Sequence, residues 1–247
     1  MEVLAHTHAA RKKWTHYFWE FFMLFLAVTL GFFVENQREH LIEHKREKQY
    51  IVSLTSDLQS DTTRLAQGNI WFDNIYRCCD TLLNNYDSLV KGYSHSTIRC
   101  FTYVLRGYPD FVNADRTMQQ LKNAGGLRLI RKTIVADSIM AYDANIRDQV
   151  IEESGITFFY DRLHDYVNEF FNFRKLDKEL ESGKTPGELE KEKPGFWLTN
   201  DPQKIEHFYN LLRKYKTSVF SYRRYLERLK SKASRLTVLL KKEYYFK

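Results

Sequence analysis

The chain has 247 residues, of which 28% are charged and 43% are hydrophobic, and its formal net charge is +7. This length allows one folded body of about 200 residues beside an N-terminal segment. Glycine (10) and proline (4) are scarce, and aromatic residues make up 15% of the chain. Such a composition argues against an all-β fold with many tight turns and favours long helices. The sequence therefore predicts an all-α protein.

The most apolar part of the chain is residues 14–34, WTHYFWEFFMLFLAVTLGFFV, which contain one acid, Glu20. About 20 mostly apolar residues in a helix cross the hydrocarbon core of a bilayer. Aromatic side chains, including Trp14 and Trp19, gather at the first end, as is typical where a helix passes the headgroup layer. This pattern predicts a transmembrane helix. The alternative is a core helix of a soluble protein, because the stretch without any charge covers only 21–34.

A cleaved signal peptide is a second alternative. Basic residues at 11–13 precede the apolar stretch, but residues 32–35 are too bulky for a cleavage site. We therefore predict an uncleaved, single-pass anchor whose N-terminus is cytoplasmic, which the basic residues before the stretch favour. In a Gram-negative bacterium this would be an inner-membrane protein with a periplasmic body. The predicted domains are a cytoplasmic tail at 1–13, a transmembrane helix at 14–36 and a helical-bundle domain at 37–247.

Glu20 is the one acid in the predicted span. An ionisable group at membrane depth is costly and indicates a function by default. Glu20 either lies near the headgroups and reaches water, or lies deeper, where another chain would have to shield it. Glu20, Asn36, Trp14 and Trp19 are accordingly candidate contacts with lipid or with a partner chain.

The charged stretch 35–48 contains no Gly or Pro, so we expect the membrane helix to continue into water. His40 and His44 lie four residues apart and share one helix face. With Glu43 or Glu47 they form a weak candidate zinc site. The alternative, a polar helix beside the membrane, is favoured. The sequence indicates no cofactor.

Three cysteines are present, Cys78, Cys79 and Cys100, and none forms a C-x-x-C pair, which excludes zinc-ribbon and thioredoxin-like motifs. In an oxidising compartment Cys78 or Cys79 could bridge to Cys100. The alternative is that all three are free and partly buried.

Two heptad-like seams predict long packed helices. Between 51 and 89, ten of twelve positions at 3,4 spacing are apolar. Asp61 and Gly68 interrupt this seam, and we expect a bend or break near Gly68. Between 205 and 240, all eleven positions at this spacing are apolar, which is the strongest periodic signal in the chain.

Several shorter features complete the predicted body. Asp115 is expected to cap a short helix, and Asp201 is expected to cap the last one, with Pro202 at its first position. Residues 133–176 predict a further long helix with a wide apolar face, and 179–202 predict a loop rich in Pro and Gly. The expected fold is one N-terminal transmembrane helix that continues into a long-helix, antiparallel bundle with a coiled-coil-like body.

Positive charge is concentrated near the C-terminus, where residues 213–247 contain twelve Lys/Arg and two acids. Three interpretations compete: a solvated helix face, a basic surface that contacts anionic headgroups, and nucleic-acid binding, which the predicted anchor disfavours. The candidate membrane-facing residues are Arg223, Arg224, Arg228, Lys230, Lys232, Arg235, Lys241 and Lys242.

Three groups of residues carry a resemblance to a known family. They are Glu20 followed by Asn36, the run Tyr50-Ile-x-x-Leu-x-x-Asp-Leu-x-x-Asp, and the run Thr117-Met-Gln-Gln-Leu-Lys-Asn-Ala-Gly-Gly-Leu-Arg-Leu-Ile. The chain thus resembles a group of uncharacterised bacterial single-pass membrane proteins with a GE…NN(W) span. It lacks the Gly before Glu20 and the Trp after Asn36. The resemblance implies an architecture but no activity, because the family's domain has no known function.

The sequence contains no P-loop, no nucleophile elbow and no H-E-x-x-H motif. We therefore expect a membrane-anchored helical scaffold or interaction subunit of a bacterial cell envelope complex, without catalysis of its own. Its expected partners are membrane lipid and either further copies of the chain or another membrane protein, and no nucleic acid. The alternative is an extracytoplasmic sensor of a small ligand that signals through a partner's membrane helix.

Overall fold

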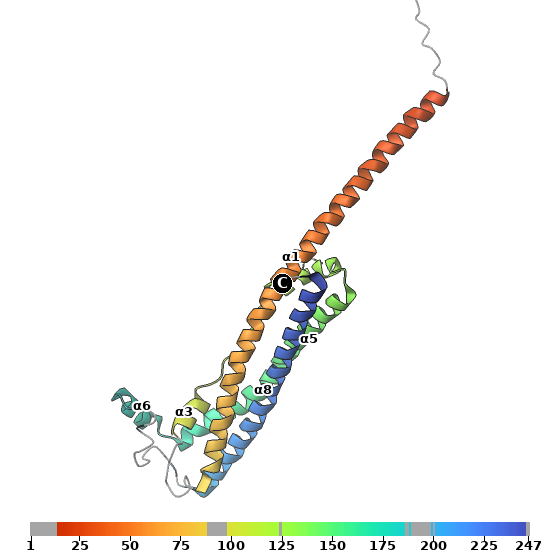
Figure 1. Cartoon of the computed structure of the whole chain (residues 1–247). Helices are drawn as coiled ribbons and strands as arrows, with labels where there is room; N and C mark the ends of the chain where they lie inside the picture. The colour runs from red at the N-terminus through yellow and green to blue at the C-terminus, as the bar shows by residue number, and fades with distance from the viewer. Residues whose placement is uncertain are drawn as a thin grey trace, which may run out of the picture. The chain divides into compact units, whose positions relative to one another are not determined.

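The computed structural model describes residues 14–87, 98–123, 125–185, 188, 199 and 201–245. The predicted tail at 1–13 and most of the predicted loop at 179–202 lie outside these residues. The helices are α1 (Trp14–Asn84), α3 (Ile98–Leu105), α4 (Arg116–Asn123), the 3₁₀ helix η1 (Gly126–Leu129), α5 (Thr133–Phe170), α6 (Phe173–Glu181) and α8 (Pro202–Tyr244). The described residues contain no β-strand, which confirms the prediction of an all-α protein (Figure 1).

The chain divides into two compact units, Met1–Tyr50 and Ile51–Lys247. The first unit contains the predicted span and the charged stretch that follows it, so the division falls beyond the predicted domain boundary at 36/37. The physical reason is visible in the burial pattern of α1. Its residues up to Tyr50 are nearly all exposed, whereas a regular alternation of buried and exposed residues begins at Ile51.

In the second unit, α1 follows the predicted seam closely. The buried apolar residues on it are Ile51, Leu54, Leu58, Leu65, Phe72, Ile75, Cys79 and Leu82. The two predicted interruptions behave differently from what was expected. Asp61 is itself buried, and α1 continues through Gly68 to Asn84, so the helix does not break there.

Helix α8 agrees with its predicted seam at every position. All eleven predicted core residues between 205 and 240 are buried. The Asp201 side chain accepts a hydrogen bond from the Gln203 N–H at 2.9 Å, and Pro202 occupies the first turn, as the capping pattern predicted. The helix ends where Tyr245 adopts a left-handed conformation with φ of 55°.

Helix α5 differs from its prediction in two ways. The predicted helix at 133–176 is divided, because Phe171 adopts an extended conformation between α5 and α6. The apolar face is also narrower than predicted, since Ile151 and Phe158 are exposed while Ile139 and Val167 are buried.

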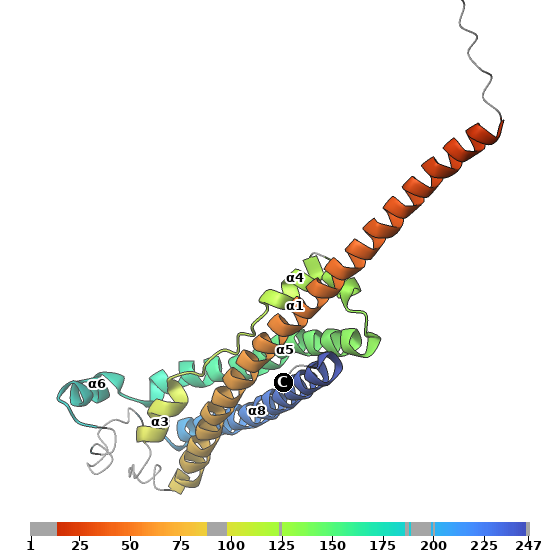
Figure 2. The ribbon, with the colours of Figure 1, turned by 45° about the horizontal axis from the view of Figure 1, so that its top comes forward.

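The second-unit part of α1 lies alongside α5 and α8 (Figures 1 and 2). Tyr209 Oη of α8 donates to the Leu82 carbonyl oxygen of α1 at 2.8 Å, and further along α8, Arg223 pairs with Asp73 of α1. Between α8 and α5 the positions likewise rise along one helix and fall along the other. Near the start of α8, Tyr166 Oη donates to the Lys204 carbonyl oxygen at 3.1 Å, and further along α8, Gln149 Nε2 donates to Tyr222 Oη at 2.8 Å. In these contacts α8 runs opposite to both other helices, so α1 and α5 run in the same direction.

Candidate functional site

The first candidate functional surface is the exposed apolar segment at 14–34 in the first unit. Helix α1 contains an 18-residue window of mean hydropathy 1.9, none of which is buried inside the protein. Trp14 is 80% exposed and Phe32 is 75% exposed, although such side chains are normally removed from water. The interpretation as a core helix predicts burial and is therefore wrong for this segment. By length and composition, α1 is able to cross a membrane.

Three polar side chains of this segment, His16, Glu20 and Thr29, bond within their own helix. His16 Nε2 lies 3.1 Å from Glu20 Oε1, and the Thr29 hydroxyl donates to the Phe25 carbonyl oxygen at 2.8 Å. Internal partners reduce the cost of placing polar groups in an apolar medium. Trp19, Glu20 and Asn36 are all exposed, so their side chains are accessible for the predicted contacts with lipid or with a partner chain.

The predicted zinc site does not assemble among the described residues. No three His, Cys, Asp or Glu side chains of the described chain come together in a cluster that could hold a metal ion. His40 is exposed, and His44 Nδ1 instead lies 3.3 Å from Oε2 of Glu47, which is almost fully buried.

A second site, which the sequence did not predict, lies in the second unit around two buried aspartates of α1 (the aspartate clamp, Asp57 and Asp61). Asp61 Oδ1 accepts a hydrogen bond from the Ala114 N–H at 2.7 Å, and Oδ2 accepts one from the Tyr142 hydroxyl at 2.8 Å. Asp57 Oδ2 accepts a bond from the Thr117 N–H at 3.1 Å. The clamp thereby joins α1 to α5 and to the start of α4.

The clamp also corrects the predicted cap of α4. Thr117 is the second residue of that helix, and its N–H is bonded by Asp57, which lies 60 positions earlier in the chain. Asp115 instead bonds the side chain of Gln119 through Oδ2. The unpaired N–H groups at a helix start donate to any carboxylate that reaches them, and tertiary packing brings Asp57 to this one.

Burial raises the pKa of the Asp61 carboxyl above its ordinary value of 3.8, and the nearby Asp57 raises it further, while the bonds from Ala114 and Tyr142 oppose this. Burial also raises the pKa of the Tyr142 hydroxyl. The sequence carried one signal of the clamp, an acid at a seam position with another acid one turn earlier.

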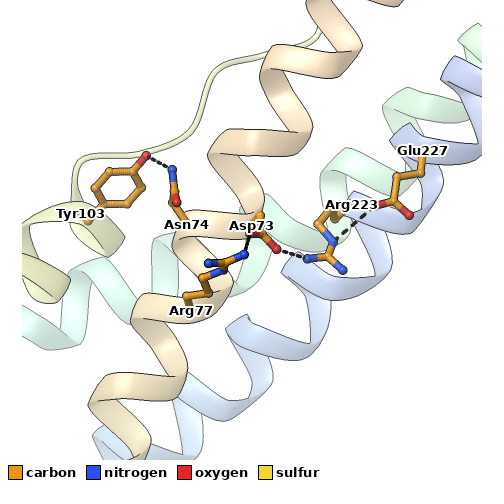
Figure 3. A network of polar contacts seen from close by, with 6 residues as sticks. All are labelled: Asp73, Asn74, Arg77, Tyr103, Arg223 and Glu227. Atoms are coloured by element: carbon orange, nitrogen blue, oxygen red, sulfur yellow. Dashed lines mark hydrogen bonds and ion pairs between the residues drawn. The ribbon is translucent and has the colours of Figure 1, made fainter.

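A polar network crosses from α1 to α8 and to α3 (Figure 3). Arg223 Nη1 lies 2.5 Å from Asp73 Oδ1, and Arg77 Nη2 lies 2.8 Å from Asp73 Oδ2. Asn74 Nδ2 donates to Tyr103 Oη at 3.2 Å. Asp73 therefore forms ion pairs with two guanidinium groups, one from its own helix and one from α8.

This network divides the predicted basic patch. Arg223 is half-buried and is held by Asp73, whereas the other predicted residues are exposed. Two of those exposed arginines lie over aromatic rings of their own helix, Arg224 over Phe220 at 5.7 Å and Arg228 over Tyr225 at 5.8 Å. The exposed members of the patch are Arg224, Arg228, Lys230, Lys232, Arg235, Lys241 and Lys242.

The interior of the second unit is filled by large side chains, among them Phe72, Tyr215 and Tyr222, which are fully buried. A cavity of about 520 Å³ lies between α1, α8 and the connection before α4. Its lining residues are Arg64, Leu65, Gln67, Gly68, Trp71, Pro109, Asp110, Phe111, Val112 and Leu226. The cavity combines one cation, one acid and one indole, and its size is within the range of small-molecule sites.

All three cysteines are free thiols. Cys79 is fully buried in the α1 seam, whereas Cys78 is half-buried.

No family model, curated protein or solved structure matches this chain, so the arguments for function come from the residues and their geometry.

Proposed function

We propose that this protein is a membrane-anchored helical scaffold or interaction subunit of a bacterial envelope complex, without catalysis of its own. The observation that carries the proposal is the exposed apolar segment at 14–34, whose apolar side chains surround the helix on all sides and have no protein to pack against. An exposed surface of this kind would drive aggregation in water. A bilayer removes it from water at little cost.

The proposed arrangement is a single-pass protein of the inner membrane, with a cytoplasmic N-terminus and a periplasmic second unit. Basic residues before the span support this orientation. In the proposal, Trp14 and Trp19 lie at the headgroup level, and Glu20 and Asn36 face lipid headgroups or a partner chain. The exposed basic residues of α8 are proposed to contact anionic lipid, because each Lys/Arg near such a surface contributes on the order of 1 kcal/mol.

The scaffold role is tested by chemical crosslinking in native membranes, followed by affinity purification of the full chain and identification of the crosslinked chains. We expect crosslinks to a second copy or to another membrane protein. The matched control carries Leu24→Arg and Val28→Arg, which should lose these crosslinks together with membrane association. A wild-type chain that stays an isolated monomer in membranes would contradict the proposal. Reporters fused to each terminus test the orientation.

The second candidate is an extracytoplasmic sensor of a small ligand, which the 520 Å³ cavity favours. Trp71 and Arg64 in its lining suit a planar or anionic ligand. Binding would bias α1, and a partner's membrane helix would supply the output. Thermal-shift screening of the full chain in detergent tests this candidate. A hit that disappears in Trp71→Ala but persists in Val112→Ala would favour the sensor over the scaffold.

A further inference from the structure

Helix α3 packs against the part of α1 that belongs to the second unit. Three residues of α1 at helical spacing, Trp71, Asn74 and Cys78, face α3. Residues three and four apart lie on one face of a helix. Trp71 Nε1 donates to the Gly107 carbonyl oxygen at 3.1 Å, and Asn74 Nδ2 donates to Tyr103 Oη at 3.2 Å.

These two bonds fix the register of the two segments. Moving from Trp71 to Asn74 along α1 corresponds to moving back from Gly107 to Tyr103 at α3. The next step along the same faces leads from Asn74 to Cys78 on α1 and from Tyr103 to Cys100 on α3. The register therefore brings the two cysteines to facing positions, and hydrogen bonding with Cys100 is the largest cause of the raised pKa of the Cys78 thiol.

Additional contacts hold this face in place. The rings of Trp71 and Tyr103 lie 5.1 Å apart between centroids, and the Arg106 guanidinium lies 5.9 Å from the Trp71 ring centroid. Gly107 has φ of 92°, a left-handed conformation that lets the chain turn away directly after α3. The contact between the cysteines is thus part of a packed face with about two turns of helix on each side.

Cys79 does not share this position. It is one residue further along α1, which rotates its side chain by about 100°, and it belongs to the seam of Ile75 and Leu82, which is fully buried. Cys78 is half-buried and is therefore the more accessible thiol of the α1 pair.

We propose that Cys78 and Cys100 are a redox-active pair that forms an intramolecular disulfide and thereby ties α3 to α1. The oxidant is a disulfide donor, such as glutathione disulfide or an oxidised protein dithiol. The Cys78 thiolate attacks one sulfur of the donor, forms a mixed disulfide and releases the first donor thiol. The Cys100 thiolate then attacks the Cys78 sulfur and releases the second. Both cysteines are oxidised, the donor disulfide is reduced to two thiols, and the two cysteine protons pass through solvent to those thiols.

The contact between the two cysteines also explains why both are free thiols. Hydrogen bonding with Cys100 and burial raise the pKa of the Cys78 thiol above its ordinary value of 9.0, so little Cys78 thiolate is present at neutral pH. The pair is expected to stay reduced without a disulfide donor and to react slowly when one is supplied. The closed loop would contain residues 79–99, and a loop of that size constrains the unfolded chain substantially.

The experiment incubates the full chain in detergent with glutathione disulfide in mildly alkaline buffer, then measures intact mass, non-reducing peptide maps and thermal unfolding. We expect the loss of two hydrogens, a peptide that links Cys78 to Cys100, and a rise in Tm of roughly 5–12 °C that a reductant reverses. Cys79→Ala should behave like wild type. Cys78→Ser and Cys100→Ser should show neither the link nor the rise.

Three outcomes would overturn the proposal: a link that contains Cys79, a stable glutathione adduct on Cys78 without ring closure, or a link that leaves Tm unchanged or lower. The wild-type peptide map decides between the cysteines even if a serine variant fails to fold. All of these residues belong to the second unit, so formation of the disulfide does not depend on whether α1 is inserted in a membrane.

Discussion

Two stretches of the same helix, α1, are rich in apolar residues, but one is exposed and the other is buried. In 14–34 the apolar side chains surround the helix on all sides, and the 18-residue window measured there has no buried residue. In 51–82 apolar residues recur at 3,4 spacing and are buried, while most residues between them are not. A helix with a single apolar stripe packs that stripe against a protein partner, whereas a helix that is apolar on all sides is typical of a large protein core or of a membrane span. Periodicity, rather than apolar content, distinguishes the two.

The largest expected effect comes from Leu24→Arg with Val28→Arg, both on the exposed apolar segment. Each arginine in the middle of a membrane helix costs about 2.5–3.5 kcal/mol on insertion scales. The two together should lower the membrane-bound fraction at least tenfold. Alkaline extraction of membranes, followed by quantification of the pellet and supernatant, measures this fraction.

The matched control for that variant is Leu24→Ile with Val28→Ile, which should stay in the pellet. The Tm of the second unit should be the same in all three proteins, because residues 24 and 28 belong to the other unit. If the double-arginine variant stayed bound to membranes after alkaline extraction, the exposed apolar segment at 14–34 would not be the membrane anchor.

The second prediction addresses the buried stretch. Leu65→Ala removes a fully buried side chain of the α1 seam and should lower the free energy of unfolding by about 2–5 kcal/mol. Val52→Ala, on the same helix but at an exposed position, should change it by less than about 0.5 kcal/mol. Urea unfolding followed by circular dichroism measures both. Membrane association should be unaffected, and equal losses in the two variants would contradict the assignment of the seam.

These seams are also where sequence reasoning succeeded. In α8 all eleven predicted positions are buried, and the cap of that helix was predicted from Asp201 and Pro202. The signal is local: an apolar period of 3.6 residues and a capping residue are both contained within one helix. The buried seam of α1 from Ile51 onward carries the same local signal.

What sequence reasoning missed depends on residues far apart in the chain. Asp61 was treated as an interruption of the seam, yet its partners Ala114 and Tyr142 lie 53 and 81 positions away. The cap of α4 was assigned to Asp115, while Asp57 supplies it through the fold. Periodicity says which residues avoid water, but not which distant donor will meet a buried acid.

The aspartate clamp provides the third prediction. Asp61→Ala would leave the Ala114 N–H and the Tyr142 hydroxyl without their acceptor, which should cost about 2–4 kcal/mol of unfolding free energy. Asp61→Asn keeps an acceptor oxygen and an amide that can donate to Tyr142, so its loss should be smaller. Chemical unfolding of both variants against wild type tests this, and an Asn variant as unstable as the Ala variant would show that the bonds contribute little.

The clamp should also make stability depend on pH. The pKa of Asp61 is raised in the folded protein above its ordinary value of 3.8, so the folded state binds its proton more tightly than the unfolded state. Stability from this group is complete below 3.8 and is lost as the pH rises through the folded pKa. Asp61→Asn cannot ionise, so unfolding measured from acid to neutral pH should show the variant gaining relative to wild type.

The smallest expected effect on stability comes from two adjacent residues of the basic patch, Arg223 and Arg224. Arg223 is 20% exposed and pairs with Asp73 at 2.5 Å, so Arg223→Ala should cost about 1–2 kcal/mol through the lost pair and the lost packing of its stem. Arg224 is exposed, and Arg224→Ala should cost less than about 0.5 kcal/mol.

A double-mutant cycle with Asp73→Ala separates the ion pair from the packing, because only the pair contributes to the coupling energy. We expect measurable coupling between Asp73 and Arg223 and none between Asp73 and Arg224. Since Arg77 also contacts Asp73 at 2.8 Å, the coupling with Arg223 should increase when Arg77 is replaced by Ala. Coupling of equal size for both α8 arginines would mean that neighbouring positions of α8 differ less than their burial suggests.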